Sequence, residues 1–230
     1  MKQKFDGYAD KYDSWFMVNE KLFESELLLY KKALGDLEGK NVLSVGCGSG
    51  LFESNVKNFE IKGIEPSPDM AEIAQKRGMN VEVITIEAAE LGENIYDVIY
   101  FNGSPSYIED LETAYTKAYT ALKKKGKLIV FDVPKESAFG FMYILAKKLN
   151  TFNHEFLDKA IPQVPYPLEL AKNGIWYTTE EQIDIMKKIG YKNFRFYQTL
   201  LNNPMYTNEE VEEVVEGYKS GGYVAIITEK

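Results

Sequence analysis

The chain has 230 residues, a length that fits one large domain, and 45% of them are hydrophobic, which is enough for a sizeable core. Its net charge of -8 argues against a general nucleic-acid or anionic-membrane surface, because such surfaces need clustered positive charge. A single cysteine, Cys47, excludes an internal disulfide framework and a multi-cysteine zinc site.

No long apolar segment follows the first lysines, and no stretch approaches membrane-spanning length. We therefore expect neither a secretory signal nor a membrane anchor. The single cysteine suits a reducing cytoplasm, and small or neutral molecules are the expected partners.

The first 35 residues combine a polar, helix-like pattern with aromatic side chains that need cover. Tyr8, Trp15 and Phe16 belong to this group. They either pack onto the domain or belong to a helical lid whose tyrosines close over a cofactor. A helix is expected over 18–32, and Glu26 interrupts its apolar face. That carboxylate either reaches solvent at the edge of the face or contributes to a substrate site.

The stretch 42–50, VLSVGCGSG, changes from a short apolar run to alternating glycines. The apolar run suits a buried parallel strand, and the glycines let a ligand lie against main-chain N–H groups. A helix starting over 51–58 would add further unpaired N–H groups. A P-loop would need Gly-Lys-Ser/Thr, and a dinucleotide fingerprint would need glycine in place of Leu51.

The G-x-G-x-G pattern instead resembles the cofactor loop of class I S-adenosylmethionine (SAM)-dependent methyltransferases. A strand over 61–65 then ends in Glu65, at the distance where α/β nucleotide folds place a carboxylate on ribose hydroxyls. The following Pro66-Ser67-Pro68 starts a helix, and residues 63–70 resemble the second cofactor block of the same class. From these two blocks the resemblance implies cofactor contacts by Gly46, Cys47, Gly48, Gly50, Glu65, Pro66, Ser67 and Met70.

The resemblance extends to three other places. It puts Tyr12 beside the cofactor, and it puts Glu87 and Ala88, after a strand over 81–86, near the adenine ring. A fourth strand over 95–101 leads into Asn102 and Gly103, where the transferred methyl group is expected, with Tyr107 on the acceptor side. Asn102 serves either this site or the turn itself.

The remaining pattern alternates helices and strands, which predicts right-handed crossovers and a parallel sheet. The expected elements are a helix over 111–122 stopped by the lysines 123–125, a strand over 126–132, a helix over 178–189, strands over 191–199 and 223–228, and a short acidic helix over 208–216. The segment 135–177 is too long for an ordinary connection and suggests a cap. It contains His154, the only histidine of the chain. His154 either acts as a general base or is a residue on the surface without a catalytic role.

The resemblance covers nearly the whole chain. It implies an α/β, Rossmann-like, doubly wound sheet of seven mostly parallel strands with an antiparallel C-terminal strand. We expect a single domain, 1–230, with a helical lid about 1–35 and an inserted cap about 135–177. One departure is Ser44, since many relatives have an acid there that braces the amino-acid end of the cofactor.

The implied function is direct methyl transfer from SAM to a nitrogen, oxygen, sulfur or carbon atom of a small molecule, leaving S-adenosylhomocysteine. No metal is needed. Catalytic candidates are Asn102, His154 and Tyr8, and substrate candidates are Tyr8, Trp15, Phe16, Glu26, Tyr107 and His154. A non-catalytic SAM-binding regulator and a nicotinamide-dependent oxidoreductase are the alternatives. The protein is expected to be a monomer or a homodimer.

Overall fold

The computed structural model describes residues 4–56 and 60–230. Its α-helices are α1 (Ala9–Val18), α2 (Glu20–Leu34), α3 (Pro68–Lys76), α4 (Leu111–Ala121), α5 (Ala138–Leu149), α6 (Leu168–Asn173) and α7 (Thr179–Ile189). The strands are β1 (Val42–Val45), β2 (Ile61–Ile64), β3 (Asn80–Glu82), β4 (Tyr96–Asn102), β5 (Leu122–Asp132), β6 (Lys192–Thr199), β7 (Val215–Glu216) and β8 (Tyr223–Glu229). Short 3-10 turns are η1 (Glu53–Asn55), η2 (Pro105–Tyr107), η3 (Glu155–Leu157) and η4 (Pro204–Tyr206).

All of these strands form one sheet, in the order β3-β2-β1-β4-β5-β8-β6-β7. The pairs from β3 to β5 are parallel, and β8 runs antiparallel to both β5 and β6. This confirms the predicted α/β fold with its antiparallel C-terminal strand. The order reverses between β1 and β4, and such a switch point is where open α/β sheets bind ligands.

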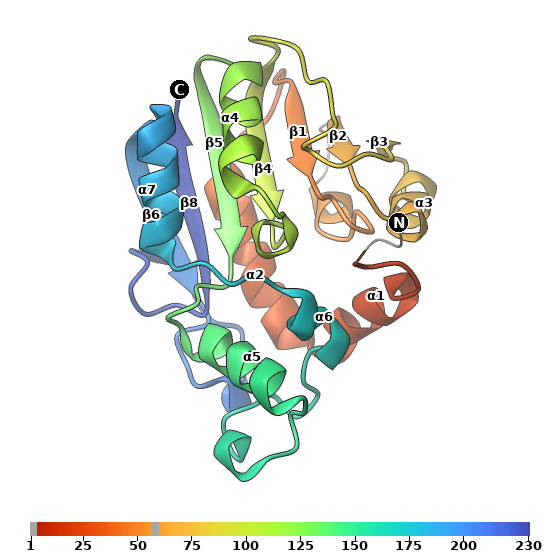
Figure 1. Cartoon of the computed structure of the whole chain (residues 1–230), viewed down its shortest axis with the longest axis vertical. Coiled ribbons are helices and arrows are strands. Elements are labelled where there is room, and N and C mark those ends of the chain that lie inside the picture. The colour runs from red at the N-terminus through yellow and green to blue at the C-terminus, as the bar shows by residue number, and fades with distance from the viewer. Residues whose placement is uncertain (1–3, 57–59) are drawn as a thin grey trace.

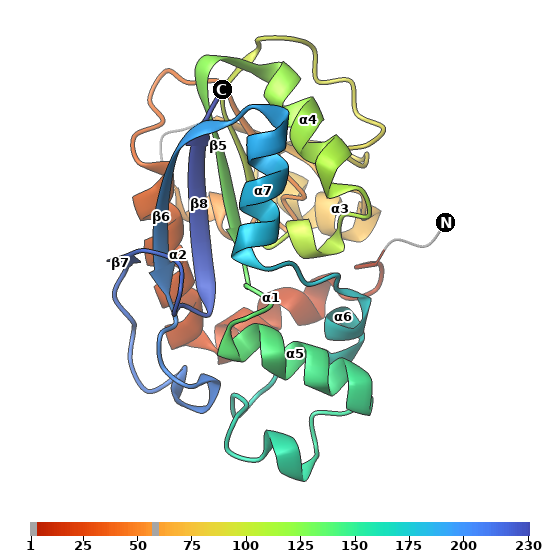
Figure 2. The same cartoon turned by 60° about the vertical axis from the view of Figure 1, so that its left-hand side comes forward.

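Side chains along β5 point alternately to the two faces of the sheet, and each face is covered by helices. Leu128 and Val130 join the core beneath α4 and α7, whereas Ile129 and Phe131 join the core beneath α2. Figure 2 shows α7 and α4 on one side of the sheet and α2 on the other. Because both faces are buried, the central strands are almost uniformly apolar, as expected for parallel strands.

A second layer of helices lies at one end of the sheet. Figures 1 and 2 both place α1, α5 and α6 beyond the carboxyl ends of the parallel strands. The segment predicted as a cap, 135–177, contains α5, η3 and α6. Aromatic contacts fill this layer, among them Trp15 with Tyr166, at 5.1 Å between ring centroids. Within the described ranges, no helix has both the length and the apolar character needed to cross a bilayer.

Two predicted helices are wrong. Over 51–58 the described residues form only the turn η1, because Glu53 points inward and accepts hydrogen bonds from buried side chains. Over 208–216 there is no α-helix. The last two residues of this range form β7, which adds an eighth strand to the sheet. There, Glu212 is buried and its carboxylate accepts from the main-chain N–H groups of Leu201 and Asn202.

Two boundaries also differ from the sequence prediction. The lysines 123–125 do not end α4, because Leu122 is already extended and starts β5. Lys123 forms an ion pair with Asp97 at 2.8 Å. The third strand ends at Glu82, so that residues 83–86 leave the sheet.

The predicted helix over 178–189 is present as α7, and Thr178 caps its start. The hydroxyl of Thr178 accepts from the N–H of Glu181 at 3.1 Å, and the Glu181 carboxylate accepts from the N–H of Thr178 at 2.6 Å. This reciprocal pair satisfies two N–H groups that the helix itself leaves unpaired.

We expect Thr178→Ala to lower the free energy of unfolding by about 1 kcal/mol, because it removes one of these hydrogen bonds. Urea denaturation measures this. Thr120→Ala is the control, since the exposed Thr120 hydroxyl donates only to a carbonyl of its own helix. Equal stability of the two variants would contradict the role of the cap.

Candidate active site

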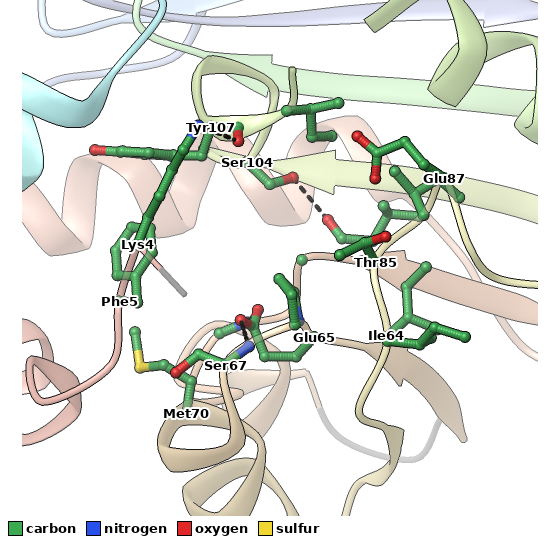
Figure 3. Close-up of a pocket in the computed structure, with 18 of the residues that line it drawn as sticks. Lys4, Phe5, Ile64, Glu65, Ser67, Met70, Thr85, Glu87, Ser104 and Tyr107 are labelled. Atoms are coloured by element: carbon green, nitrogen blue, oxygen red, sulfur yellow. Dashed lines mark hydrogen bonds between the residues drawn. The ribbon is translucent and has the colours of Figure 1, made fainter. Parts of the chain in front are cut away.

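A cavity of about 510 Å³ opens at the carboxyl ends of β1, β2 and β4 (Figure 3). It lies at the switch point of the sheet. Its lining comes from the N-terminal segment (Lys4, Phe5, Tyr12), the end of β1 (Val45, Gly46, Gly48), the end of β2 (Ile64, Glu65, Pro66, Ser67, Met70), the segment after β3 (Ile84, Thr85, Ile86, Glu87) and the end of β4 (Asn102, Gly103, Ser104, Tyr107, Ile108, Glu109, Asp110).

The three glycines of the loop have different surroundings. Gly48 has φ +56, and a Cβ there would meet only Met70 Cε, at 3.8 Å. At Gly46 a Cβ would come within 2.6 Å of Ser104 Cβ, and at Gly50 within 2.6 Å of Met79 Sδ. Gly46 and Gly50 are therefore needed for close packing, whereas Gly48 leaves bare main chain beside the cavity.

Glu65 connects this loop to the end of the neighbouring strand. One carboxylate oxygen accepts from the N–H of Gly48 and the other from the N–H of Ser67, both at 2.9 Å. Each oxygen keeps a second lone pair for another donor. Burial raises the pKa of Glu65 to about 7, and the two main-chain hydrogen bonds oppose this rise.

Lys4 and Phe5, where the described part of the chain begins, lie over the cavity. Phe5 packs edge-on against Tyr107 at 4.8 Å and Tyr12 at 5.9 Å, and the Lys4 ammonium donates to the carbonyl oxygen of Tyr107 at 2.9 Å. Figure 3 shows Lys4 and Phe5 standing on one side of the cavity, opposite Ile64. Sequence reasoning missed both residues, because no local motif marks them.

Further polar contacts fix this segment to the two cofactor blocks. The Ser67 hydroxyl donates to Asp6 at 2.8 Å, and the N–H of Gly7 donates to Asp69 at 2.8 Å. On α1, Asp13 accepts from the Ser49 hydroxyl at 2.5 Å and pairs with Arg77 at 2.7 Å. The N-terminal segment is thus attached to both the glycine loop and α3.

The departure at Ser44 has a structural counterpart. The buried Ser44 hydroxyl donates to Glu53 at 2.8 Å, and the Tyr100 hydroxyl donates to the same oxygen at 2.8 Å. Burial raises the pKa of Glu53, and these hydrogen bonds oppose the rise. A carboxylate therefore lies beside β1 although position 44 is a serine, but it does not line the cavity.

The far side of the cavity is polar at Asn102. Its side-chain oxygen accepts from the Tyr223 hydroxyl at 3.0 Å, which ties the end of β4 to the start of β8. Ser104 donates to the carbonyl oxygen of Val45 at 2.7 Å. Glu87 belongs to the segment that follows β3. The Lys117 ammonium donates to the main-chain carbonyl oxygens of Glu87 and Ala89 in this segment.

Several predicted site residues do not line the cavity. Cys47 points behind the loop, into the core that it shares with Ala71, Ala74 and Val81, Gly50 is packed against α3, and Ala88 is exposed. Tyr8, Trp15, Phe16, Glu26 and His154 are absent from the lining as well.

Burial explains two of these absences and local structure a third. Trp15 and Phe16 are in the main core, and the Trp15 ring N–H donates to the carbonyl oxygen of Val164. His154 caps η3 by accepting from the N–H of Phe156, and the segment that contains η3 is at the lower end of the view in Figure 1. In this structure His154 is therefore not placed to take a proton from an acceptor.

Among residues 4–56 and 60–230, no group of three or more histidine, cysteine or acidic side chains is arranged to hold a metal ion. The residues that sequence reasoning missed, including Thr85, Ser104 and Ile108, carry no signal of their own. They enter the lining because the chain leaves β3 and β4 at their carboxyl ends.

Comparison with known proteins points to one protein family. Residues 19–195 match the model of a methyltransferase domain. A crystal structure from Thermotoga maritima, described as a SAM-dependent methyltransferase and possible histamine N-methyltransferase, is 32% identical with a TM-score of 0.83, covering 99% of this chain and 98% of that one.

Curated proteins are similar as well. An uncharacterized protein of Methanocaldococcus jannaschii is 31% identical over 98% of both chains. Malonyl-[acyl-carrier protein] O-methyltransferase 1 of Ilyobacter polytropus is 24% identical over 85% of this chain and 66% of its own length. On the family match and the full-length similarity, the chain belongs to the SAM-dependent methyltransferases.

Proposed function

We propose that the cavity binds SAM and that the protein transfers its methyl group directly to a small-molecule acceptor. The observation that carries this proposal is Glu65, whose two oxygens accept from the N–H groups of Gly48 and Ser67 and each keep a free lone pair. Two ribose hydroxyls could donate to them. A volume of about 510 Å³ is in the range of cofactor and small-ligand sites.

The lining residues fit the different parts of this cofactor. We assign the ribose to Glu65, the adenine to the segment that contains Thr85, Ile86 and Glu87, and the amino-acid end to the main chain of Gly46 and Gly48. Apolar side chains such as Ile64 and Ile108 suit the faces of a ring. These assignments follow the order of the strands from β1 to β3.

When bound, SAM supplies a methyl group made electrophilic by its sulfonium centre. The protein then has to hold an acceptor in line and keep water away. Phe5, Tyr12 and Tyr107 form an aromatic cover suited to excluding water, and Asn102 offers an amide held in place by Tyr223. This mechanism needs no covalent intermediate with a side chain.

The aromatic cover over part of the cavity supports a small acceptor. The similar proteins differ in what they act on, since one is described as a malonyl-[acyl-carrier protein] O-methyltransferase and another as a possible histamine N-methyltransferase. The N-terminal segment, attached to Ser67, Asp69 and Arg77, leaves a covered site rather than an open groove. Family membership speaks against the nicotinamide-dependent alternative.

We expect SAM to bind in the micromolar range and Glu65→Ala to weaken binding about 100-fold, because the ribose hydroxyls lose a charged acceptor. Gly48→Val should also weaken it, since a branched side chain would stand in the cavity in a left-handed conformation. Isothermal titration calorimetry measures both. Glu90→Ala, at an exposed acid, is the control, and unchanged binding in both test variants would remove the proposal.

Binding through the ribose should depend on pH. The pKa of Glu65, raised by burial to about 7, means that the ionised fraction rises between pH 6 and pH 8. Because hydroxyl donors favour the ionised form, adenosine should bind about tenfold more tightly at pH 8 than at pH 6. Adenosine carries the ribose hydroxyls and does not titrate in this range. Glu65→Gln should bind it weakly and equally at both pH values, and a variant that kept the wild-type pH dependence would contradict the assignment.

A further inference from the structure

Main-chain donors beside the cavity are already in use. The N–H groups of the lining that donate to other atoms of the protein are those of Gly46, Gly48, Ser67 and Gly103. Their acceptors are the carbonyl oxygens of Ile64 and Phe131 and the carboxylate of Glu65. A negatively charged group of a ligand therefore has to find its donors elsewhere in the lining.

The cofactor proposed for this cavity brings such a group. The amino-acid end of SAM carries an ammonium and a carboxylate, and its sulfonium adds a second positive charge. The main-chain carbonyl oxygens of Gly46 and Gly48 are acceptors only, so they suit the ammonium and not the carboxylate. The assignment of this end to the main chain thus leaves its negative charge without a partner, and a charged donor would be the strongest one.

The lining offers one cation for this purpose. Among the described residues that line the cavity, the acids are Glu65, Glu87, Glu109 and Asp110, and the one basic residue is Lys4. The acids suit a ligand with two positive charges. Lys4 is the only charged group of the described lining that can donate to a carboxylate.

Lys4 also lies on the side of the cavity where the amino-acid end is expected. The strand order β3-β2-β1-β4 places adenine, ribose and amino-acid end in succession from β3 to β1. The Lys4 ammonium is attached next to this end, since it donates at 2.9 Å to the carbonyl oxygen of Tyr107, in the turn η2 that follows β4. Figure 3 shows Lys4 on the side opposite Glu87, which belongs to the proposed adenine side.

The ammonium of Lys4 keeps donors for a ligand. It carries three N–H groups, and within the described part of the chain its hydrogen-bond acceptor is the Tyr107 carbonyl oxygen. The neighbouring Phe5 packs against Tyr107 and Tyr12, which fixes the backbone from which Lys4 projects. Lys4 itself is half-buried, so a charge pair formed there is screened less than a pair on the open surface.

We propose, resting on the SAM binding proposed above, that the Lys4 ammonium pairs with the carboxylate of the cofactor. Lys4 then distinguishes SAM and S-adenosylhomocysteine, which carry this carboxylate, from adenosine derivatives that lack it. Because Lys4 belongs to the segment that covers the cavity, the pairing also joins this cover to the bound cofactor.

The test is isothermal titration calorimetry of the full chain with three ligands. S-adenosylhomocysteine has the whole amino-acid end, its decarboxylated form keeps only the amine, and 5′-methylthioadenosine has neither group. We expect the wild-type protein to prefer S-adenosylhomocysteine to the decarboxylated form about tenfold, and Lys4→Met to abolish this preference by weakening S-adenosylhomocysteine alone. Lys4→Arg keeps the positive charge and should retain most of the preference.

Lys11→Met is the matched control, because Lys11 is an exposed lysine of the same segment whose ammonium lies over the ring of Tyr8. It should leave all three affinities unchanged. Equal weakening of all three ligands by Lys4→Met would show that Lys4 only holds the segment in place through Tyr107. Unchanged affinity for S-adenosylhomocysteine would show that its charge serves no group of the cofactor.

Either of these two results would overturn the assignment of Lys4 while leaving SAM binding intact. If the wild-type protein bound none of the three ligands and no SAM, the proposed function would fail, and this inference with it.

Discussion

The site depends on the Glu65 carboxylate, which holds two loops in place through Gly48 and Ser67. The parallel pairing of β1 with β2 makes this possible, because it brings the two carboxyl ends together. The N–H groups of Gly46 and Cys47 both donate to the carbonyl oxygen of Ile64, so the loop turns directly beside β2. An acid at the end of β2 then lies within reach of the turn, and burial there makes its charge state sensitive to what it binds.

The reversal of strand order at β1 and β4 determines where the remaining groups can stand. Segments leaving β1, β2, β3 and β4 converge on one cavity, and the N-terminal segment covers a second side of it with Lys4, Phe5 and Tyr12 (Figure 3). The cofactor side uses main chain and one carboxylate. The opposite side uses the aromatic rings of Phe5, Tyr12 and Tyr107, which come from the N-terminal segment, α1 and η2.

Local signals in the sequence were sufficient for the sheet, the glycine loop and the position of Glu65. The apolar runs, the Thr178 cap and the spacing of loop and acid each depend on neighbouring residues. The errors at 51–58 and 208–216 have another cause, which is contact with distant parts of the chain. Glu53 turns inward and accepts from Tyr100, and the main-chain N–H of Glu212 donates to Ser25. The same holds for Lys4 and Phe5, whose place over the cavity comes from contacts with Tyr107. No hydrophobic periodicity in the sequence predicts such contacts.

The position of the two chain ends has a practical consequence. Lys4 and Phe5 line the cavity. Because β8 runs antiparallel to β5, the last residues of the chain lie at the opposite end of the strands (Figure 1). An affinity tag or fusion partner joined before Met1 would be separated by only three residues from Lys4, the first residue of the lining. One joined at Lys230 would sit clear of it, and is the better choice for preparing active material.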